Sequence, residues 1–141
     1  YLYNVRGSIK SKEEKKNERM QWLFRITRES DIHCISILRM DRRTFCILCD
    51  MVRDFGGLRP TRNMSSEEIV AMFVYTLAHH EKNRTIGLTF LRSGETVSRQ
   101  FNLCLLAVLK LHDLLLENPE PITDECTDDR WKYFKVLYIV N

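Results

Sequence analysis

The sequence predicts an all-α fold, a multi-helix bundle that contains a helix-turn-helix and ends in a short irregular or strand-like tail. Apolar residues recur at helical spacing in several segments of the 141-residue chain. Nothing in residues 1–119 alternates with period two over a useful length, and glycine and proline are few, with 5 and 3 residues. The length suits one domain with a real core, and 44% apolar against 29% charged residues is not a disordered composition.

The N-terminal segment, residues 1–30, is predicted to be a charged helix or arm. Residues 8–29 begin with a highly charged stretch and finish with five large apolar side chains, namely Met20, Trp22, Leu23, Phe24 and Ile26. This spacing predicts a helix that docks through its C-terminal half, with its first half exposed or frayed. The connector that follows, to Met40, has a secondary structure that the pattern leaves open.

The two central helices have recognisable starts. The Asp41 carboxylate can accept the free amide protons of a first turn, which predicts a helix over residues 41–55. A loop follows at residues 59–63. Ser65 and Glu68 have the spacing of a capping box, and the helix after them is apolar on nearly every side. Such a helix belongs at the centre of the core.

A helix-turn-helix is predicted over residues 84–116, within a helical core of residues 31–118. Asn83 can cap a short first helix that ends at Arg92-Ser93-Gly94. A long second helix then begins near Glu95 and runs to about Leu116. A helical wheel turns one side of this helix to the core, with Val97, Phe101, Cys104, Leu105 and Val108.

In this motif the second helix presents its first turns to the major groove, where polar and basic side chains meet phosphates and base edges. We expect the DNA-facing set to be Arg84, Arg92, Ser93, Thr96, Ser98, Arg99 and Asn102. Arg99 suits guanine or phosphate, and Asn102 suits adenine. Glu95 is an objection, because a carboxylate at this tip repels phosphates unless it pairs with Arg92 or accepts from a cytosine.

The same wheel gives the long helix a second apolar face, formed by Leu103, Leu106 and Leu114. A face of this kind needs cover from a partner, a second copy or another domain. Helix-turn-helix geometry is also common in proteins that never bind DNA. The residues alone therefore leave DNA contact and protein interaction equally open.

Charge, apolar runs and cysteine positions bear on whether the chain has a nucleic-acid partner, a membrane partner or a metal site. The net charge is +3. Basic residues are in excess over residues 1–30 and 82–116, and acidic residues are in excess over residues 117–135. Ordinary solvated helix faces explain this pattern better than a nucleic-acid partner does. No apolar run approaches the ~20 residues that span a bilayer, so no membrane partner is expected. Five scattered cysteines fit a reducing compartment, and the Cys46-x-x-Cys49 pair lies in an apolar helical pattern typical of buried thiols. We expect no metal site and no cofactor.

Several strings resemble one known family, the plant PIF/Harbinger transposase-derived nuclease-like proteins, over about residues 30–135. They run from Cys34 to Met40, through Gly56-Gly57-Leu58, and on to Ala78-His79-His80 with Lys82-Asn83-Arg84. The most characteristic run extends from Phe90 through Arg92-Ser93-Gly94-Glu95-Thr96-Val97-Ser98-Arg99 to Phe101-Asn102. These motifs are weak singly and fairly specific in combination.

The resemblance implies a helical N-terminal domain with a helix-turn-helix, placed ahead of an RNase H-like catalytic domain with three acidic metal ligands. Here residues 119–141 instead form an acidic connector and a divergent hydrophobic tail, and no catalytic carboxylate carries over. The acids Asp124, Glu125, Asp128 and Asp129 lack the rigid strand scaffold that two-metal chemistry needs. We therefore expect a non-catalytic domesticated-transposon protein in the nucleus. Its expected partners are DNA, a Myb-like or chromatin-associated protein, or a second copy of the chain.

Overall fold

The computed structural model describes residues 11–116, and every regular element in this part of the chain is helical, which confirms the all-α class. Their order is α1 (Lys12–Phe24), the π-helix η1 (Arg25–Glu29), α2 (Asp31–Leu38), α3 (Arg42–Asp54), α4 (Ser66–His79), α5 (Asn83–Thr89), α6 (Gly94–Leu109) and α7 (His112–Leu115). The predicted strand-like tail lies outside the described residues. No described helix combines the length and apolar character that a membrane span requires.

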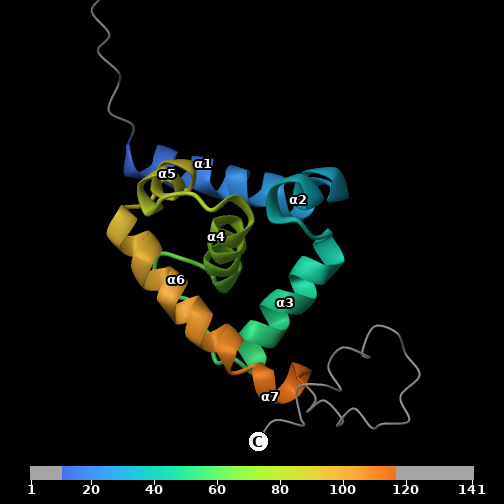
Figure 1. Ribbon diagram of the computed structural model, residues 1–141. Helices are drawn as coiled ribbons and strands as arrows, with labels where there is room; N and C mark the ends of the chain where they lie inside the picture. Colours follow the sequence, from blue (N-terminus) through green and yellow to red (C-terminus); the bar gives the residue numbers. More distant parts are fainter. Residues whose placement is uncertain (1–10, 117–141) are drawn as a thin grey trace, which may run out of the picture.

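Helix α4 runs through the middle of the molecule (Figure 1). The other helices surround it, with α1 and α2 along one side, α3 along a second and α6 along a third. Every residue from Ile69 to Val74 is buried, as the all-round apolar pattern predicts. The Phe73 ring meets the Phe101 ring of α6 at a centroid distance of 5.0 Å. The core is therefore built outward from α4, and α6 packs directly on it.

Polar caps begin most of these helices. Ser11 and Glu14 form a reciprocal capping box at α1, Ser30 caps α2, and the Asp41 carboxylate accepts from the Thr44 amide at 2.7 Å to begin α3 as predicted. The connector of unassigned structure is thus largely helix α2. The sequence pattern alone did not identify Ser30 as the N-cap of α2, because charged residues precede it.

Two predicted caps are wrong in detail. Ser65 does cap α4, since its hydroxyl accepts from the Glu68 amide at 3.2 Å, but the Glu68 carboxylate does not return to Ser65. That carboxylate binds an arginine instead, which is a stronger partner than a backbone amide. Asn83 does not cap α5 either, because it is the first helical residue and Lys82 occupies the cap without a side-chain bond.

The predicted long helix is interrupted. Helix α6 ends at Leu109, and the short α7 follows after a turn at Lys110 and Leu111, so no continuous rod reaches Leu116. Leu111 is 2% exposed and belongs to the core, and its amide bonds to the Val108 carbonyl in a tightened last turn. A wheel drawn at 100° per residue misses this break, because neither glycine nor proline marks it.

Candidate nucleic-acid interface

The predicted helix-turn-helix is present as α5, a tight turn and α6. Leu91 adopts a left-handed conformation with φ of 50°, and the Arg92 amide bonds back to the Gly87 carbonyl at 2.7 Å. A Cβ built on Gly87 would lie 2.6 Å from the Arg92 carbonyl oxygen, closer than real side chains come. Only glycine therefore lets the turn fold back onto α5 so tightly.

The start of α6 is fixed by local hydroxyl groups. Ser93 is the N-cap, and its hydroxyl accepts from the Thr96 amide at 3.2 Å. The hydroxyls of Ser93 and Thr96 also lie 2.9 Å apart and share a hydrogen bond. Each hydroxyl oxygen has two lone pairs besides its proton, so further polar contact remains within the capacity of both groups.

A buried ion pair anchors the turn to the core. The Arg92 Nε donates to Glu68 Oε1 at 2.7 Å, and its Nη2 donates to Glu68 Oε2 at 2.9 Å. The same Nη2 donates to the Asn63 carbonyl at 2.7 Å. The two side chains are 12% and 7% exposed. Burial, and secondly the charge of Arg92, lower the pKa of Arg19, which shows that this cation also lies near the pair.

The structure therefore places Arg92 in a role other than the predicted one. Its guanidinium is engaged inside the molecule, so it is not a free phosphate contact. Nor does Glu95 pair with it, since Arg92 has Glu68 as its carboxylate partner. Glu95 is exposed at the start of α6, where its charge opposes an anionic ligand.

The remaining predicted residues lie on or near the surface at this end of α6. Ser93, Arg99 and Asn102 are exposed, Thr96 and Ser98 are half-buried, and Arg84 is exposed on α5. A Cβ built on Gly94 would lie 4.0 Å from the Asn83 carbonyl oxygen, so the two helices start side by side. Within residues 11–116, neither Arg84 nor Arg99 forms an ion pair.

The core side of α6 is shifted slightly from the predicted one. Val97, Gln100, Cys104 and Ala107 are the buried residues of the helix. The buried amide oxygen of Gln100 has no hydrogen-bond partner among residues 11–116. Phe101, Leu105 and Val108 are only partly buried at the margin of the core. Relative to a core centred on Val108, this core turns Leu109 further outward, and Leu109 is 56% exposed.

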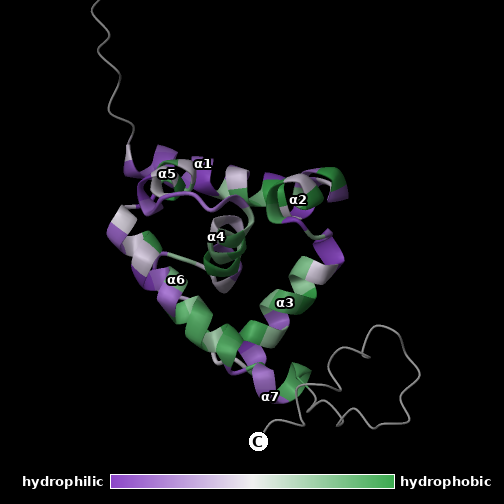
Figure 2. Ribbon diagram, viewed as in Figure 1, coloured by the Kyte–Doolittle hydropathy of each residue, from purple (hydrophilic) through white to green (hydrophobic). Residues whose placement is uncertain are grey.

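The second apolar face is present on α6, where Leu103, Leu106 and Leu109 are 46%, 59% and 56% exposed. Leu114 is 52% exposed as well, but it lies beyond the break, on α7 with Leu115. Figure 2 shows the second half of α6 as hydrophobic, whereas its first turns are polar. Helix α6 thus has a polar outer surface at its start and an apolar outer surface at its end.

Cys49 and Cys104 are buried thiols of the described residues. Burial raises the pKa of Cys104 to about 12 and raises that of Cys49 further still. Cys46, which was expected to be buried, is exposed, because position 46 turns away from the core that Phe45 and Cys49 enter. Among residues 11–116, no group of three or more His, Cys, Asp or Glu side chains could hold a metal ion. The acidic stretch 124–129 lies outside the described residues.

A protein-family model described as "Domain of unknown function (DUF8040)" matches residues 14–110. The chain belongs to this family. No curated protein and no solved structure matches the chain.

The DUF8040 match begins in α1 and ends where α6 ends, so the family unit includes the helix-turn-helix and both partners of the buried ion pair. It also crosses the predicted boundary between residues 30 and 31, which agrees with the burial of Leu23 and Ile26. Sequence reasoning missed the link between Glu68 and Arg92. The one available signal was an acidic residue beside the apolar run of α4.

Proposed function

We propose that this DUF8040 domain binds duplex DNA through the start of α6. The observation that carries the proposal is the pair of exposed arginines, Arg84 and Arg99, which have no ion-pair partner in residues 11–116 and lie beside a helix start. An unpaired surface arginine is a ready contact for phosphate or for guanine. The buried Arg92–Glu68 pair supports the proposal, because it fixes the turn that aims α6.

The contacts divide by chemistry. Arg84, together with the Ser93 and Thr96 hydroxyls at the helix start, would contact the phosphate backbone and set the register. Arg99 and Asn102 lie one and two turns further along the outer surface of α6, where they would meet base edges in the major groove. Ser98 flanks them. Arg92 leaves the contacting set and holds the turn instead.

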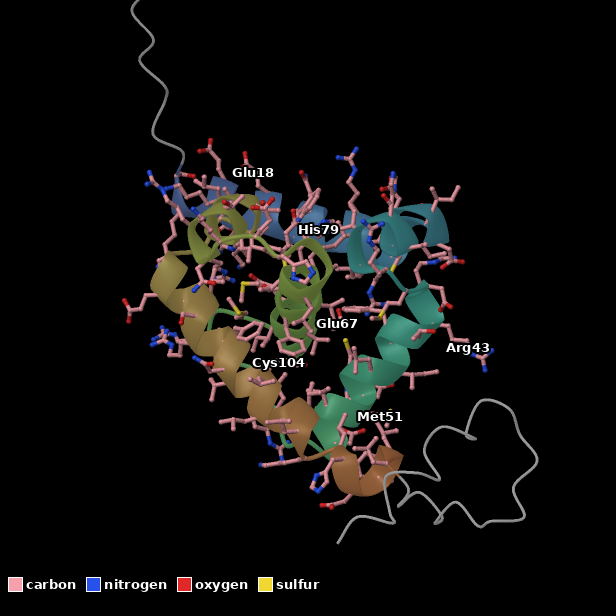
Figure 3. All side chains as sticks on the ribbon, in the orientation of Figure 1. Glu18, Arg43, Met51, Glu67, His79 and Cys104 are labelled. Carbon is pink, nitrogen blue, oxygen red and sulfur yellow. The ribbon has the colours of Figure 1, made fainter. Side chains whose placement is uncertain are left out.

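A salt titration of DNA binding tests the proposal. We expect the purified chain to bind a random duplex at ~50 mM salt, with affinity that falls steeply as salt rises. Arg99→Ala weakens this binding, whereas Glu95→Gln strengthens it, because the substitution removes a negative charge that faces phosphate. Arg43→Ala is the matched control, since Arg43 is exposed on α3 on the opposite side from α6 (Figure 3). Absence of binding at ~50 mM salt contradicts the proposal.

The wider biological assignment is part of the same proposal. The run from Phe90 to Asn102 resembles that of PIF/Harbinger transposase-derived proteins, which supports a domesticated-transposon origin, a nuclear location and a non-catalytic role. Incubation of duplex DNA with magnesium or manganese tests the last point. We expect no cleavage, and cleavage that a chelator abolishes would contradict the assignment.

The exposed leucine face favours a second candidate function, protein interaction without direct DNA contact. Leu103, Leu106 and Leu114 present apolar surface that water solvates poorly, and a Myb-like protein, a chromatin-associated protein or a second copy could cover it. Size-exclusion chromatography with light scattering shows whether a second copy of the chain covers this face. If a dimer forms, Leu106→Ser should dissociate it, while Leu77→Ser, on the exposed side of α4, should not. A monomer that also binds neither partner class contradicts this candidate.

A further inference from the structure

The loop between α3 and α4 lies along α6. At one end, a Cβ built on Gly56 would lie 2.6 Å from the Ala107 carbonyl oxygen near the end of α6. At the other end, the Asn63 carbonyl accepts from Arg92, the residue before the N-cap of α6. The loop therefore runs antiparallel to α6 and ends beside the helix start.

A tight turn at the end of this loop displays Arg62. Thr61 and Met64 exchange two backbone hydrogen bonds, with their amides donating across the turn at 2.9 and 3.3 Å. Arg62 and Asn63 occupy the tip. Because the Arg92 guanidinium holds the Asn63 carbonyl at 2.7 Å, the tip is attached to the helix-turn-helix itself.

Arg62 carries an available charge. It is exposed, and within residues 11–116 it has no carboxylate partner. Three other surface arginines are paired within the domain, Arg28 with Glu67, Arg42 with Asp31 and Arg53 with two aspartates. The exposed Arg39, Arg43, Arg59 and Arg99 have no ion pair within residues 11–116 either, so it is the position of Arg62 that distinguishes it. Arg62 and Arg84 each neighbour an asparagine that meets the region of residues 92–94. The Asn63 carbonyl accepts from the Arg92 guanidinium at 2.7 Å, and the Asn83 carbonyl oxygen lies 4.0 Å from a Cβ built on Gly94.

We propose that Arg62 is a further DNA-contacting residue, which binds a backbone phosphate beside the start of α6. This inference rests on the proposed function. It adds the loop 59–63 as a second DNA-contacting element, separate in sequence from the helix-turn-helix and joined to it through Arg92. The contact is to phosphate because an arginine on a loop at the flank of the inserted helix faces the backbone rather than the groove floor.

The test compares Arg62→Ala with wild type and with Arg43→Ala in DNA-binding titrations between ~50 and ~300 mM salt. Loss of one phosphate contact lowers the slope of log affinity against log salt by about 0.9, which corresponds to about 5- to 10-fold weaker binding near 0.1 M salt. The loss should be equal on duplexes of different sequence, because a phosphate contact carries no base information. Arg43→Ala should bind like wild type.

Arg62→Lys separates charge from folding. It should keep most of the affinity and slope, because lysine preserves the charge on the same turn. If Arg62→Lys loses as much as Arg62→Ala, or if Arg62→Ala matches Arg43→Ala, the inference is wrong. If Arg99→Ala still weakens binding in that case, the proposed function stands without the loop. If the wild-type chain binds no DNA, both proposals fail together.

Discussion

Substitution of Arg92 by methionine tests how strongly the turn is attached to the core. The change removes two hydrogen bonds to the Glu68 carboxylate and one to the Asn63 carbonyl, and it keeps an apolar stem of similar length. The Glu68 side chain is 7% exposed and would be left without the guanidinium that binds it. Breaking a buried pair in this way costs about 3–5 kcal/mol of unfolding free energy. This is a large share of the roughly 5–15 kcal/mol that stabilises a domain.

Urea unfolding followed by circular dichroism measures the effect. With a denaturant dependence of about 1.5 kcal/mol per molar, the midpoint should fall by about 2–3 M. The double variant Arg92→Met/Glu68→Met should recover much of the loss, because two apolar side chains replace the pair without leaving an unpaired charge. Arg53→Met is the control, since its pairs with Asp50 and Asp54 are exposed and the midpoint should hardly move.

Two results would refute this reasoning. One is an Arg92→Met midpoint close to that of wild type, which would mean that the carboxylate reaches water or another cation at little cost. The other is a double variant that is less stable than Arg92→Met by the whole loss of unfolding free energy that Glu68→Met causes on its own. Simple additivity of that kind would show that the two side chains are not energetically coupled.

Four further predictions concern the same region and the thiols. Gly87→Ala should lower the unfolding free energy by about 1–3 kcal/mol, because its methyl group would meet the Arg92 carbonyl, and an unchanged urea midpoint would show that the turn adapts. Ser93→Ala should cost about 1 kcal/mol through the lost N-cap, measured in the same assay, while Ser93→Thr should retain most of it. At pH 8, alkylation followed by peptide mapping should modify exposed Cys46 well before Cys104, and equal rates in the folded chain would contradict the burial of Cys104. Because burial raises the pKa of Cys104 to about 12, stability should be full below the ordinary thiol pKa and fall as pH rises toward 12, and Cys104→Ala should reduce that alkaline loss.

Local patterns predict the helices of this fold well. The Asp41 cap, the all-round apolar run of α4 and the turn before α6 are all encoded within a few residues, so the sequence indicates them directly. The break after Leu109 is different, because it depends on how Leu111 enters the core and on no local signal. Helix periodicity gives the faces of a helix but not the point at which tertiary packing bends it.

The candidate site likewise combines features that local sequence predicts with features that tertiary packing sets. The exposure of Arg99 and Asn102 follows from the wheel, since both lie opposite the buried Val97. The burial of Arg92 does not, because its partner Glu68 is 24 residues away and Asn63 is 29 residues away. Pairing over such distances is fixed by the packing of α4 against the turn, which single-sequence patterns do not specify.

One guanidinium bonds both Glu68 of α4 and the carbonyl of Asn63, so the spacing between the loop tip and the start of α6 is set before any ligand arrives. A partner that meets both elements would then lose little entropy to ordering them on association. Variants that remove these Arg92 hydrogen bonds should therefore weaken complexes mainly through the entropy lost when the loop tip and the start of α6 become ordered. This holds even though the substituted side chain does not touch the ligand.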